Sequence, residues 1–444
     1  MPETTAIQRF RGPLWAALYF VMAVAPLPIA LWRHTEDGRG FWIELGVALG
    51  FAGLAMMGLQ FALTARFRWI GRGVSLDDMM QVHRQAGILA VVFVLAHPVI
   101  LLAAHPAYFS FLDPRVNAPR TIALVVATAA VILLLVLPLY RRRLGISYEW
   151  WRLTHSILAF LAVFVGLGHV LMVGHYVSGV AKPLVWIAMT GGALLLLAHT
   201  RIVRPIAVRQ RPWRVAEVRP EGERVWSIAF EAEGHPGLSF SPGQFVWLSL
   251  ESSPLSLQQH PFTIASSAER GSRIELTIKE LGDFTQTIRD VEPGALAFLE
   301  GPYGQFTPDG ISADATVFVV GGIGVTPAMS TLRTMRDRGQ TTPIVVVYGA
   351  VDLDRLVFRD ELESLTAELD LELVYVLDEP PPDWQGERGP FTADTVARIR
   401  QRLGAADAYY FICGPEPMMD VVESTLAADG VPRSRVHAER FNLV

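Results

Sequence analysis

Cysteine and charge are what this sequence has least of. A single Cys among 444 residues cannot form an internal disulfide, and it also excludes iron–sulfur clusters and zinc sites built on cysteine. Only 18% of the residues are charged, whereas about a quarter is usual for a soluble protein. Disorder is excluded as well, because 51% of the residues are hydrophobic and the 23 Phe and 11 Trp need burial.

Acidic residues are scarce in the first half of the chain. Residues 1–204 hold 17 Lys and Arg but only 8 Asp and Glu, whereas residues 205–444 hold 21 and 35. The mean hydropathy of the whole chain is +0.33. A basic, apolar first half followed by an acidic second half of ordinary composition indicates a membrane domain joined to a soluble one. The acidic half also argues against nucleic acid as a partner.

Long apolar runs fill the first half. Most of them reach the roughly 17–25 residues that a helix needs to cross a hydrocarbon core about 30 Å thick. We therefore expect an integral membrane protein with a six-transmembrane-helix bundle. The expected spans are residues 14–32, 41–65, 79–104, 121–140, 151–173 and 183–199.

The basic residues predict the orientation of these spans. They concentrate on one side of the expected membrane, and the positive-inside rule makes that side cytoplasmic. Both termini and the whole second half are then expected in the cytoplasm, at the plasma membrane. The cytoplasmic set is Arg9, Arg11, Arg66, Arg68, Arg72, Arg141, Arg142, Arg143, Arg201, Arg204, Arg209 and Arg211, and the outer set is Arg33, Arg39, Arg115, Arg120 and Lys182.

After residue 204 the pattern changes to short β-rich runs separated by Gly and Pro, typical of an antiparallel β-barrel. Further on, apolar strands alternate with helices, which predicts a parallel α/β sheet of the nucleotide-binding kind. We expect three domains, at 1–204, 205–312 and 313–444. The expected barrel strands are 213–231, 244–250, 273–279 and 295–300; the expected sheet strands are 316–320, 344–348, 372–376 and 408–413; the expected helices are 327–338, 358–369, 392–403 and 417–429.

Two of the expected spans carry pairs of histidines with the same spacing. His83 and His97 lie fourteen residues apart in the third span, as do His155 and His169 in the fifth. Fourteen residues rise about 21 Å and come within roughly 40° of a whole number of turns, so each helix presents two imidazoles on nearly one face. Because the two spans run in the same direction, His83 can face His155 near the cytoplasm and His97 can face His169 near the outside. Two stacked bis-imidazole sites are what two b-type haems require.

A lone intramembrane histidine is more often a hydrogen-bonded interior residue or part of a proton path. The repeated spacing favours haem ligation over that interpretation. Phe93, Phe160 and Phe164 lie between the two histidine levels. For them, packing against lipid or core is favoured over a bridge between haems.

Short motifs follow one another through the second half. They are PGQF (242–245), HPFTIASS (260–267), IKELGDFT (278–285), GPYG (301–304), GGIGVTP (321–327), CGPEPMM (413–419) and ERFNLV (439–444). Their order resembles the ferredoxin–NAD(P)H reductase superfamily. Together with the membrane histidines, the chain resembles prokaryotic NADPH oxidases and ferric reductase-like transmembrane flavocytochromes, over essentially its whole length.

The resemblance implies an FAD site. Phe262 and Thr263 would contact the isoalloxazine and ribityl region, and His260, before Pro261, stands where soluble relatives often have Arg. The flavin pyrophosphate would be held by backbone N–H groups and a hydroxyl. The residues expected there are Lys279, Gly282 and Thr285.

The resemblance also implies a nicotinamide nucleotide site after the first sheet strand. Glycines there let the backbone approach a phosphate, and the helix N-terminus stabilises negative charge. Thr326 would add a hydroxyl, and Pro327 suits a first helical turn. The expected set is Gly321, Gly322, Gly324, Thr326, Pro327, Gly414, Pro415 and Met418.

Three residues are expected at the reaction centre. In relatives, the cysteine at Cys413 lies near the nicotinamide, although a lone buried Cys is usually a packing residue. Glu439 and Phe441 match the family's terminal pattern, in which the aromatic ring stacks on the flavin until the nicotinamide arrives. Here three residues follow Phe441, unlike in many relatives.

The sequence YGAVDLDR bears on the choice of coenzyme. Relatives that prefer NADPH often have Arg at the place of Val351, to pair with the 2′-phosphate. Asp352 is suited to bond a ribose 2′-hydroxyl and to repel a phosphate, whereas Arg355 could compensate. NADH is favoured over NADPH, and both stay open.

The expected function is electron transfer from cytoplasmic NAD(P)H through FAD and two b-type haems to an acceptor across the membrane, with oxygen giving superoxide as the first choice. A ferric-chelate reductase of the same architecture is the alternative, and a partner redox protein or quinone is a third acceptor. A haem- or redox-sensing membrane protein without turnover and a histidine-based proton channel or transporter are rivals from other classes. The lipid bilayer is an expected partner, and no obligate protein partner is evident.

Overall fold

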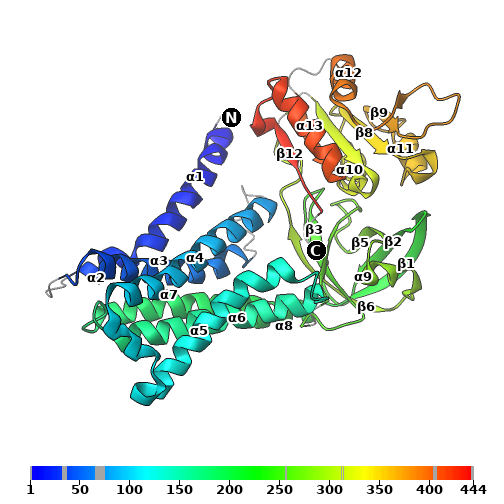
Figure 1. Cartoon of the computed structure of the whole chain (residues 1–444). Coiled ribbons are helices and arrows are strands. Elements are labelled where there is room, and N and C mark those ends of the chain that lie inside the picture. The colour runs from blue at the N-terminus through cyan, green and yellow to red at the C-terminus, as the bar shows by residue number, and fades with distance from the viewer. Residues whose placement is uncertain are drawn as a thin grey trace. The chain divides into compact units, whose positions relative to one another are not determined.

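The computed structural model divides into two compact units, Met1–Pro205 and Ile206–Val444, which we call the membrane unit and the reductase unit (Figure 1). The structure describes residues 3–32, 38–65, 76–255, 258–311, 313, 315–403 and 408–441. Arg33, Arg66, Arg68 and Arg72, used above to predict the orientation, lie outside the described residues.

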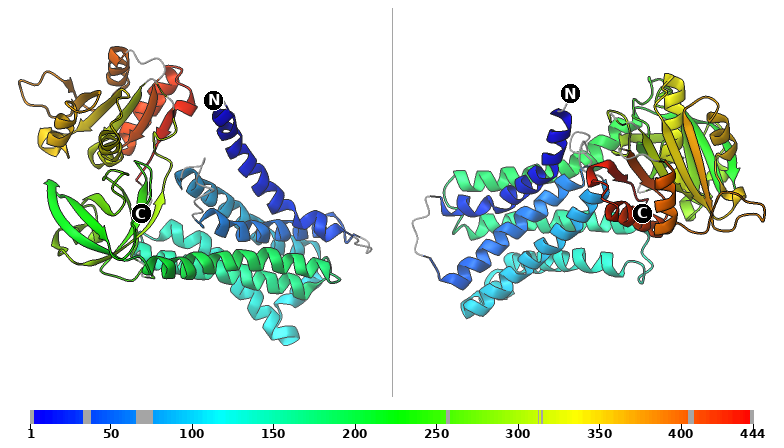
Figure 2. Two further views of the ribbon diagram at one scale, coloured as in Figure 1. Left: turned by 180° about the vertical axis from the view of Figure 1, so that it is seen from behind. Right: turned by 90° about the horizontal axis from the view of Figure 1, so that it is seen from above.

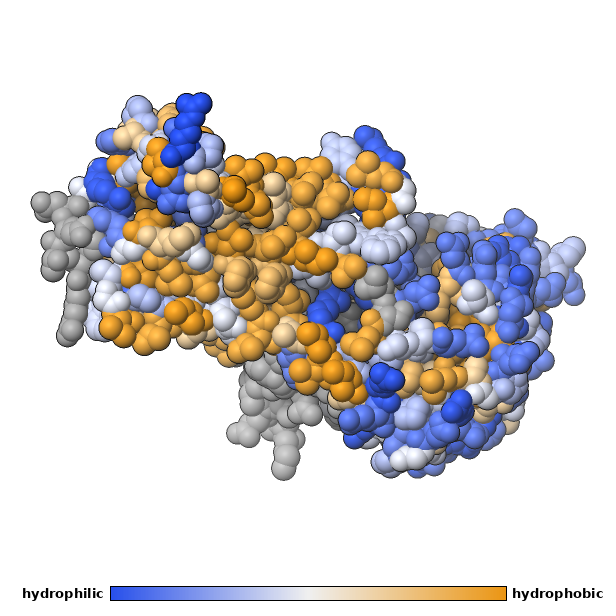
Figure 3. Space-filling model, turned by 90° about the horizontal axis from the view of Figure 1, so that it is seen from below, coloured by the Kyte–Doolittle hydropathy of each residue, from blue (hydrophilic) through white to orange (hydrophobic). Residues whose placement is uncertain are grey.

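Helices make up the membrane unit. Its described residues contain six stretches long and apolar enough to cross a membrane, as the sequence predicts. Hydrophobic side chains form a broad continuous surface on this unit, whereas hydrophilic ones dominate the reductase unit (Figure 3). The chain is an integral membrane protein. The helices are α1 (Glu3–Val24), α2 (Pro26–Leu31), α3 (Phe41–Leu63), α4 (Leu76–Ala104), α5 (Pro114–Tyr140), α6 (Tyr148–Val173), α7 (Ala181–Ala198) and α8 (Arg204–Arg209).

Two of the predicted spans are not single α-helices. The first is interrupted between Val24 and Pro26, because a proline has no N–H for the helix ladder and its ring crowds the preceding turn. The sixth continues past Ala198 through a turn of π-helix, His199–Val203, into α8.

A six-stranded antiparallel sheet opens the reductase unit, in the order β4-β3-β6-β1-β2-β5. Its two ends meet where Ile264 pairs with Leu276, so the sheet closes into the predicted barrel. The predicted strand at 213–231 is wrong, because it is a hairpin that turns at Arg224, a residue with φ of 57°. The strands are β1 (Trp213–Gly222), β2 (Val225–Ala232), β3 (Phe245–Leu250), β4 (His260–Thr263), β5 (Arg273–Lys279) and β6 (Leu296–Tyr303), and the short helix α9 (Asp283–Gln286) follows β5.

A parallel six-stranded sheet follows, in the order β10-β9-β8-β7-β11-β12. The four strands predicted from apolar runs are present, and two short edge strands join them. The strands are β7 (Thr316–Gly321), β8 (Ile344–Ala350), β9 (Leu371–Leu377), β10 (Glu387–Arg388), β11 (Tyr409–Cys413) and β12 (Val436–Ala438); the helices are α10 (Thr326–Arg338), α11 (Arg359–Leu365), α12 (Ala393–Leu403) and α13 (Glu416–Ala428).

Helices cover both faces of this sheet (Figure 2). Side chains alternate along a strand, so Phe318 and Val320 of β7 pack against α10 and α11, while Val317 and Val319 pack against α12 and α13. The strands are therefore apolar on both faces, which is why they appear in the sequence as short uninterrupted apolar runs.

Candidate functional site

The four intramembrane histidines form two pairs at two levels. The rings of His83 on α4 and His155 on α6 have their centres 6.3 Å apart, and those of His97 and His169 are 6.2 Å apart. Two imidazoles that bind one metal ion, each through a nitrogen about 2 Å away, need ring centres roughly 6 Å apart. The pairing expected from the fourteen-residue spacing is therefore present, at a separation that suits an iron between the rings.

A backbone carbonyl on α3 holds one ring of the His97–His169 pair. The Nδ1 atom of His97 lies 2.8 Å from the carbonyl oxygen of Gly46. A protonated Nδ1 that donates to this carbonyl leaves Nε2 as the unprotonated nitrogen, which is the form a metal requires. The ring reaches the carbonyl because residue 50 is glycine: a Cβ there would lie 2.7 Å from His97 Nδ1.

The His83–His155 pair differs. Within the described part of the chain, the Nδ1 atoms of His83 and His155 are buried without a hydrogen-bond partner. The indole of Trp151 packs 5.5 Å from the His155 ring. Buried polar atoms without partners are rare because burial removes their water. Within the described residues no group of three or more His, Cys, Asp or Glu could hold a metal ion by itself. The donor set of the two pairs thus fits a ligand that supplies its own equatorial ligands, as haem does.

Two of the three phenylalanines between the two levels face outward, whereas Phe93 is half-buried and packs against the helical core. Phe160 and Phe164 stack on each other, with centres 5.6 Å apart and planes 7° apart, and they are 41% and 55% exposed. This exposure favours packing against lipid over a bridge between the two histidine pairs.

In the reductase unit, the predicted flavin residues lie on β4. The ring of His260 stacks on Phe284, with centres 4.1 Å apart, and Phe262 lies parallel to Phe284 at 6.1 Å. These flat rings offer the kind of surface on which an isoalloxazine stacks. Phe284 was missed by sequence reasoning, although it stands between Gly282 and Thr285, two residues that were predicted for the site.

The turn predicted to hold the flavin pyrophosphate is closed on itself. The Thr285 hydroxyl oxygen accepts hydrogen bonds from the N–H groups of Leu281 and Gly282, at 2.8 and 2.9 Å. Lys279, at the end of β5, is exposed. The turn is thus fixed by its own hydrogen bonds, and the roles of Gly282, Thr285 and Lys279 toward FAD stay predictions.

Two different physical reasons explain why the loop after β7 contains glycines. A Cβ on Gly321 would lie 2.8 Å from both Met418 Sδ and Pro415 Cδ, and one on Gly324 would strike the carbonyl group of Cys413. These two glycines let the GGIG and CGP loops pack together. Gly322 differs, because it has φ of 55° and open space where a side chain would stand.

The remaining predicted nucleotide residues stand at the start of α10 and in the CGP loop. A Cβ on Gly414 would lie 2.9 Å from the Gly321 nitrogen, which places Gly414 in the same tight contact. Pro327 occupies the first turn of α10, as expected. The Thr326 hydroxyl is buried and donates to the Ile323 carbonyl at 3.0 Å, so it is bonded to the preceding turn and does not face an open surface.

A tyrosine that sequence reasoning missed supports the GGIG loop from below. The Tyr348 hydroxyl donates to the Gly322 carbonyl at 3.1 Å and accepts from the Val357 N–H at 3.0 Å. Burial raises the pKa of Tyr348, so its hydroxyl keeps its proton and remains a donor. Its position at the end of a buried strand was the available signal.

The C-terminal segment lies between the edge of the sheet and the barrel. Glu439 N–H donates to the Ile412 carbonyl at 3.1 Å, and a Cβ on Gly304 would lie 3.6 Å from Glu439 Oε1. Arg440 pairs with Asp420 and Glu423 of α13, both at 2.7 Å. Phe441 is 45% exposed.

Cys413 is fully buried at the end of β11. A thiol that solvent does not reach is a packing residue. Its position near the nicotinamide stays a prediction.

Around the residues that bear on the choice of coenzyme, acidic groups engage the nearby arginine. Asp352 accepts from the Arg355 N–H at 3.0 Å, and its carboxylate lies 3.5 Å from Arg355 Nε. Glu223 of the barrel lies 3.7 Å from the same guanidinium. Arg355 therefore already has two carboxylates beside it.

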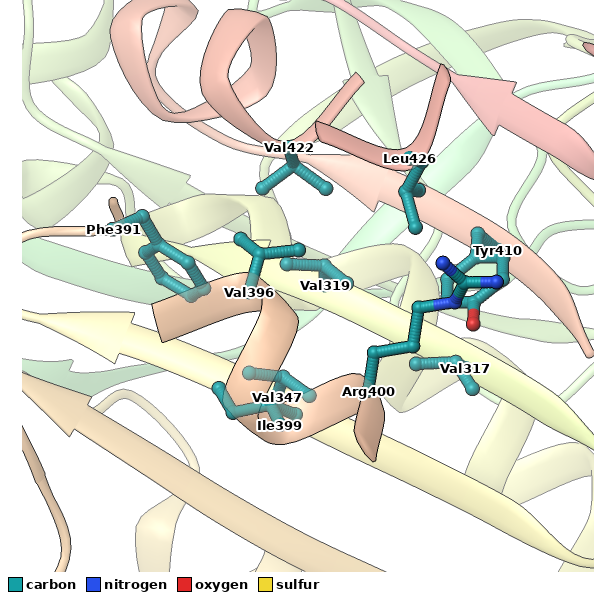
Figure 4. A pocket seen from close by; sticks show the side chains of 10 residues that line it. All are labelled: Val317, Val319, Val347, Phe391, Val396, Ile399, Arg400, Tyr410, Val422 and Leu426. Atoms are coloured by element: carbon teal, nitrogen blue, oxygen red, sulfur yellow. The ribbon is translucent and has the colours of Figure 1, made fainter. Parts of the chain in front are cut away.

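The close-up in Figure 4 shows an apolar cavity of about 20 Å³ between the sheet and helices α12 and α13. Val317, Val396 and Val422 are among its lining residues. It has room for about one water molecule. It is therefore a packing defect and no nucleotide site.

Six membrane spans, an antiparallel barrel and a doubly covered parallel sheet together define a membrane-bound, nicotinamide-dependent flavoprotein. Family models match in the same order: a ferric reductase like transmembrane component over residues 49–166, an FAD-binding domain over 213–307 and an oxidoreductase NAD-binding domain over 318–424. The chain belongs to the ferric reductase-like transmembrane flavoproteins with a ferredoxin–NADP reductase-type half. It is an NAD(P)H-dependent oxidoreductase.

Individual proteins are similar to about half of this chain. Ferredoxin–NADP reductase B of Sorangium cellulosum (strain So ce56) is 32% identical over 236 residues, which are 52% of this chain and 96% of that protein. The reductase component of propane 2-monooxygenase from Rhodococcus jostii (strain RHA1) is 31% identical over 257 residues, 56% of this chain and 68% of that one. Among solved structures, a ferredoxin reductase in carbazole 1,9a-dioxygenase is 25% identical with a TM-score of 0.46, covering 52% of this chain and 69% of that chain.

Proposed function

We propose that the protein carries electrons from cytoplasmic NAD(P)H through FAD and two b-type haems to an acceptor on the far side of the plasma membrane. This proposal rests on the two histidine pairs, which lie at two levels on α4 and α6. Within each pair, the ring centres are 6.2 or 6.3 Å apart. Bound FAD would supply the conversion of a two-electron donor into one-electron transfer, which haem carriers require.

The chain's own residues then have positional roles. Each imidazole pair would hold one haem iron through two ring nitrogens, so the histidines would serve electron transfer and not substrate binding at the metal. His260, Phe262 and Phe284 present aromatic faces on the barrel side, and the exposed Phe441 ring would cover the flavin until a nicotinamide replaces it. The open backbone at Gly322 would receive a phosphate of the nucleotide.

For the acceptor, we propose molecular oxygen, reduced to superoxide. The test is reduction of cytochrome c by the purified, haem-loaded protein with NADH or NADPH. We expect reduction that superoxide dismutase abolishes. Protein that reduces a ferric chelate but never oxygen would contradict this acceptor and establish the ferric-chelate reductase.

Turnover itself separates the enzyme from the rivals of other classes. Steady NAD(P)H consumption with an artificial acceptor is expected from the enzyme. A membrane sensor would bind nucleotide without consuming it. A histidine-based proton channel would carry no haem pigment.

A further inference from the structure

The helix that follows the GGIG loop is tied by polar side chains to the segment that follows the flavin strand. On α10, Ser330 donates to the Ser266 carbonyl at 2.9 Å, and Thr334 accepts from the Ala268 N–H at 2.9 Å. Residues 265–270, which we call the post-β4 segment, come directly after the strand with His260 and Phe262. The contact between α10 and the post-β4 segment therefore links the GGIG loop to the flavin strand β4, because each of these motifs lies only a few residues away along the chain.

Arg333 lies at the centre of this contact and is 8% exposed. Its guanidinium donates to the Ala265 carbonyl at 3.0 Å and to Glu275 of β5 at 2.7 Å. On its other edge it forms a bidentate pair with Glu361 of α11, at 2.7 and 2.6 Å. One buried cation therefore joins the barrel, α10 and α11.

The network extends further into the barrel. Glu275 also accepts from Arg219 of β1 at 2.9 Å, and its backbone N–H donates to the Ser266 hydroxyl at 3.1 Å. At the outer end of the same helix face, Arg270 pairs with Asp337 at 3.0 Å. Residues 330, 333, 334 and 337 share one face of α10, and all four contact the post-β4 segment or the strand beside it.

Stability alone is a weak explanation for a buried ion network. Apolar side chains of similar volume often stabilise a protein equally well or better, because burying charges costs their hydration. A guanidinium fork, however, is satisfied only in one geometry, since each N–H must meet its own acceptor. An apolar contact would allow α10 to slide along the barrel, whereas this one does not.

We propose that Arg333 is a positioning residue for hydride transfer, which holds the nucleotide loop at the start of α10 in fixed register with the flavin strand β4. The inference rests on the proposed function of the reductase unit. In the reaction, C4 of the nicotinamide gives a hydride, two electrons and one proton, to N5 of FAD, and leaves as NAD(P)⁺. Misplacement by about 1 Å can slow such a step roughly 100-fold without weakening binding.

The test is anaerobic stopped-flow reduction of the bound flavin in the full-length protein in detergent, at increasing NADH. For Arg333→Met we expect the limiting rate constant to fall at least about tenfold, while the dissociation constant for NADH and the FAD content stay near wild type. Arg333→Lys should recover part of the rate, because it restores the charge without the fork. Arg402→Met is the matched control, since Arg402 on α12 pairs with Glu372 of β9 at 2.8 Å, outside this contact.

A folded Arg333→Met with a lower melting temperature but a wild-type limiting rate would overturn the inference. If that variant fails to accumulate, the Ser330→Ala/Thr334→Val double variant decides by the same two measurements, because it removes two ties and buries no unpaired charge. Wild-type protein whose flavin neither NADH nor NADPH reduces would instead refute the proposed function itself, and with it this inference.

Discussion

At the scale of single residues, two glycines of the same GGIG loop have different structural roles. Gly324 is pressed against the Cys413 carbonyl group, so any side chain there must move backbone. Gly322 has open space around it and a positive φ of 55°, and its carbonyl is held by Tyr348. Gly324 serves packing, whereas Gly322 leaves the open space that a nucleotide phosphate would need under the proposed function.

Exchanging each of these glycines for alanine should separate binding from folding. Gly322→Ala should fold with a loss of about 1 kcal/mol from left-handed backbone strain and should weaken NADH binding. Gly324→Ala should lower the thermal stability far more, because backbone atoms must give way. Titration of NADH and thermal unfolding of both variants check this. Equal effects of the two changes on both measurements would contradict the assignment.

The charge around Arg355 predicts the coenzyme preference. Asp352 and Glu223 lie beside its guanidinium. The 2′-phosphate of NADPH would therefore be repelled by two carboxylates, and the charge of Arg355 is already partly neutralised. We expect a higher kcat/KM for NADH than for NADPH, and Asp352→Ala should narrow the ratio by about tenfold, the equivalent of about 1.4 kcal/mol. Wild-type protein that prefers NADPH would show this interpretation to be mistaken.

At the scale of elements, α3 supports the His97–His169 pair. Gly46 supplies the carbonyl for His97, and Gly50 leaves the space for its ring. Among the described residues, a Cβ at position 58 of the same helix would meet only Ala193 Cβ, at 3.5 Å. The helix is therefore demanding at position 50 and tolerant at position 58.

Gly50→Ala should displace the His97 ring and lower the haem content from about two per chain toward one. Gly58→Ala, on the same helix, should keep the wild-type content. Haem extraction and protein quantification measure both. Unchanged haem in a folded Gly50→Ala variant would show that α3 does not position this ligand.

Sequence patterns predicted these elements where the signal was local. Most of the six spans, the apolar sheet strands and the fourteen-residue histidine spacing each lie within one helix or strand, so periodicity and length suffice. The break before Pro26 and the turn at Arg224 were absorbed into longer apolar or β-rich runs. β10 and β12 have two and three residues, too few for any periodicity.

The site was predictable only in part for the same reason. The pairing of histidines on α4 and α6 follows from helix geometry, and the loop motifs stand in the sequence as written. The Gly46 contact to His97 spans 51 positions, and Arg333 meets Glu275 across 58. Such partners are fixed by tertiary packing and leave no mark in a local pattern. Phe284 and Tyr348 were missed because each acts through a neighbour brought in by the fold.

At the scale of the whole molecule, stability in acid should depend on the buried network of the reductase unit. Burial alone would raise the pKa of Glu275, but the charges of Arg333 and Arg219 outweigh it and hold the pKa below its ordinary value. A lowered pKa in the folded state contributes stability above the unfolded value of about 4.3. That contribution is lost as the pH falls through the folded pKa.

Glu275→Gln should therefore be less stable than wild type at pH 7 by about 3 kcal/mol, and the difference should shrink as the pH falls below about 4. The measurement is unfolding of the full-length protein in detergent, monitored by the fluorescence of the FAD that unfolding releases. A difference that stays constant with pH would mean that the carboxylate charge contributes nothing to folding.

The proposed electron transfer through the whole chain depends on haem binding by the two histidine pairs. The most direct measurement is a reduced-minus-oxidised absorption spectrum of the purified protein, with haem and FAD counted per chain, for wild type and His97→Leu. We expect two b-type haems and one FAD per chain in the wild type. We expect one haem in His97→Leu, and NAD(P)H should still reduce the flavin of this variant. A wild-type protein reconstituted with haem that shows no Soret band would contradict the account.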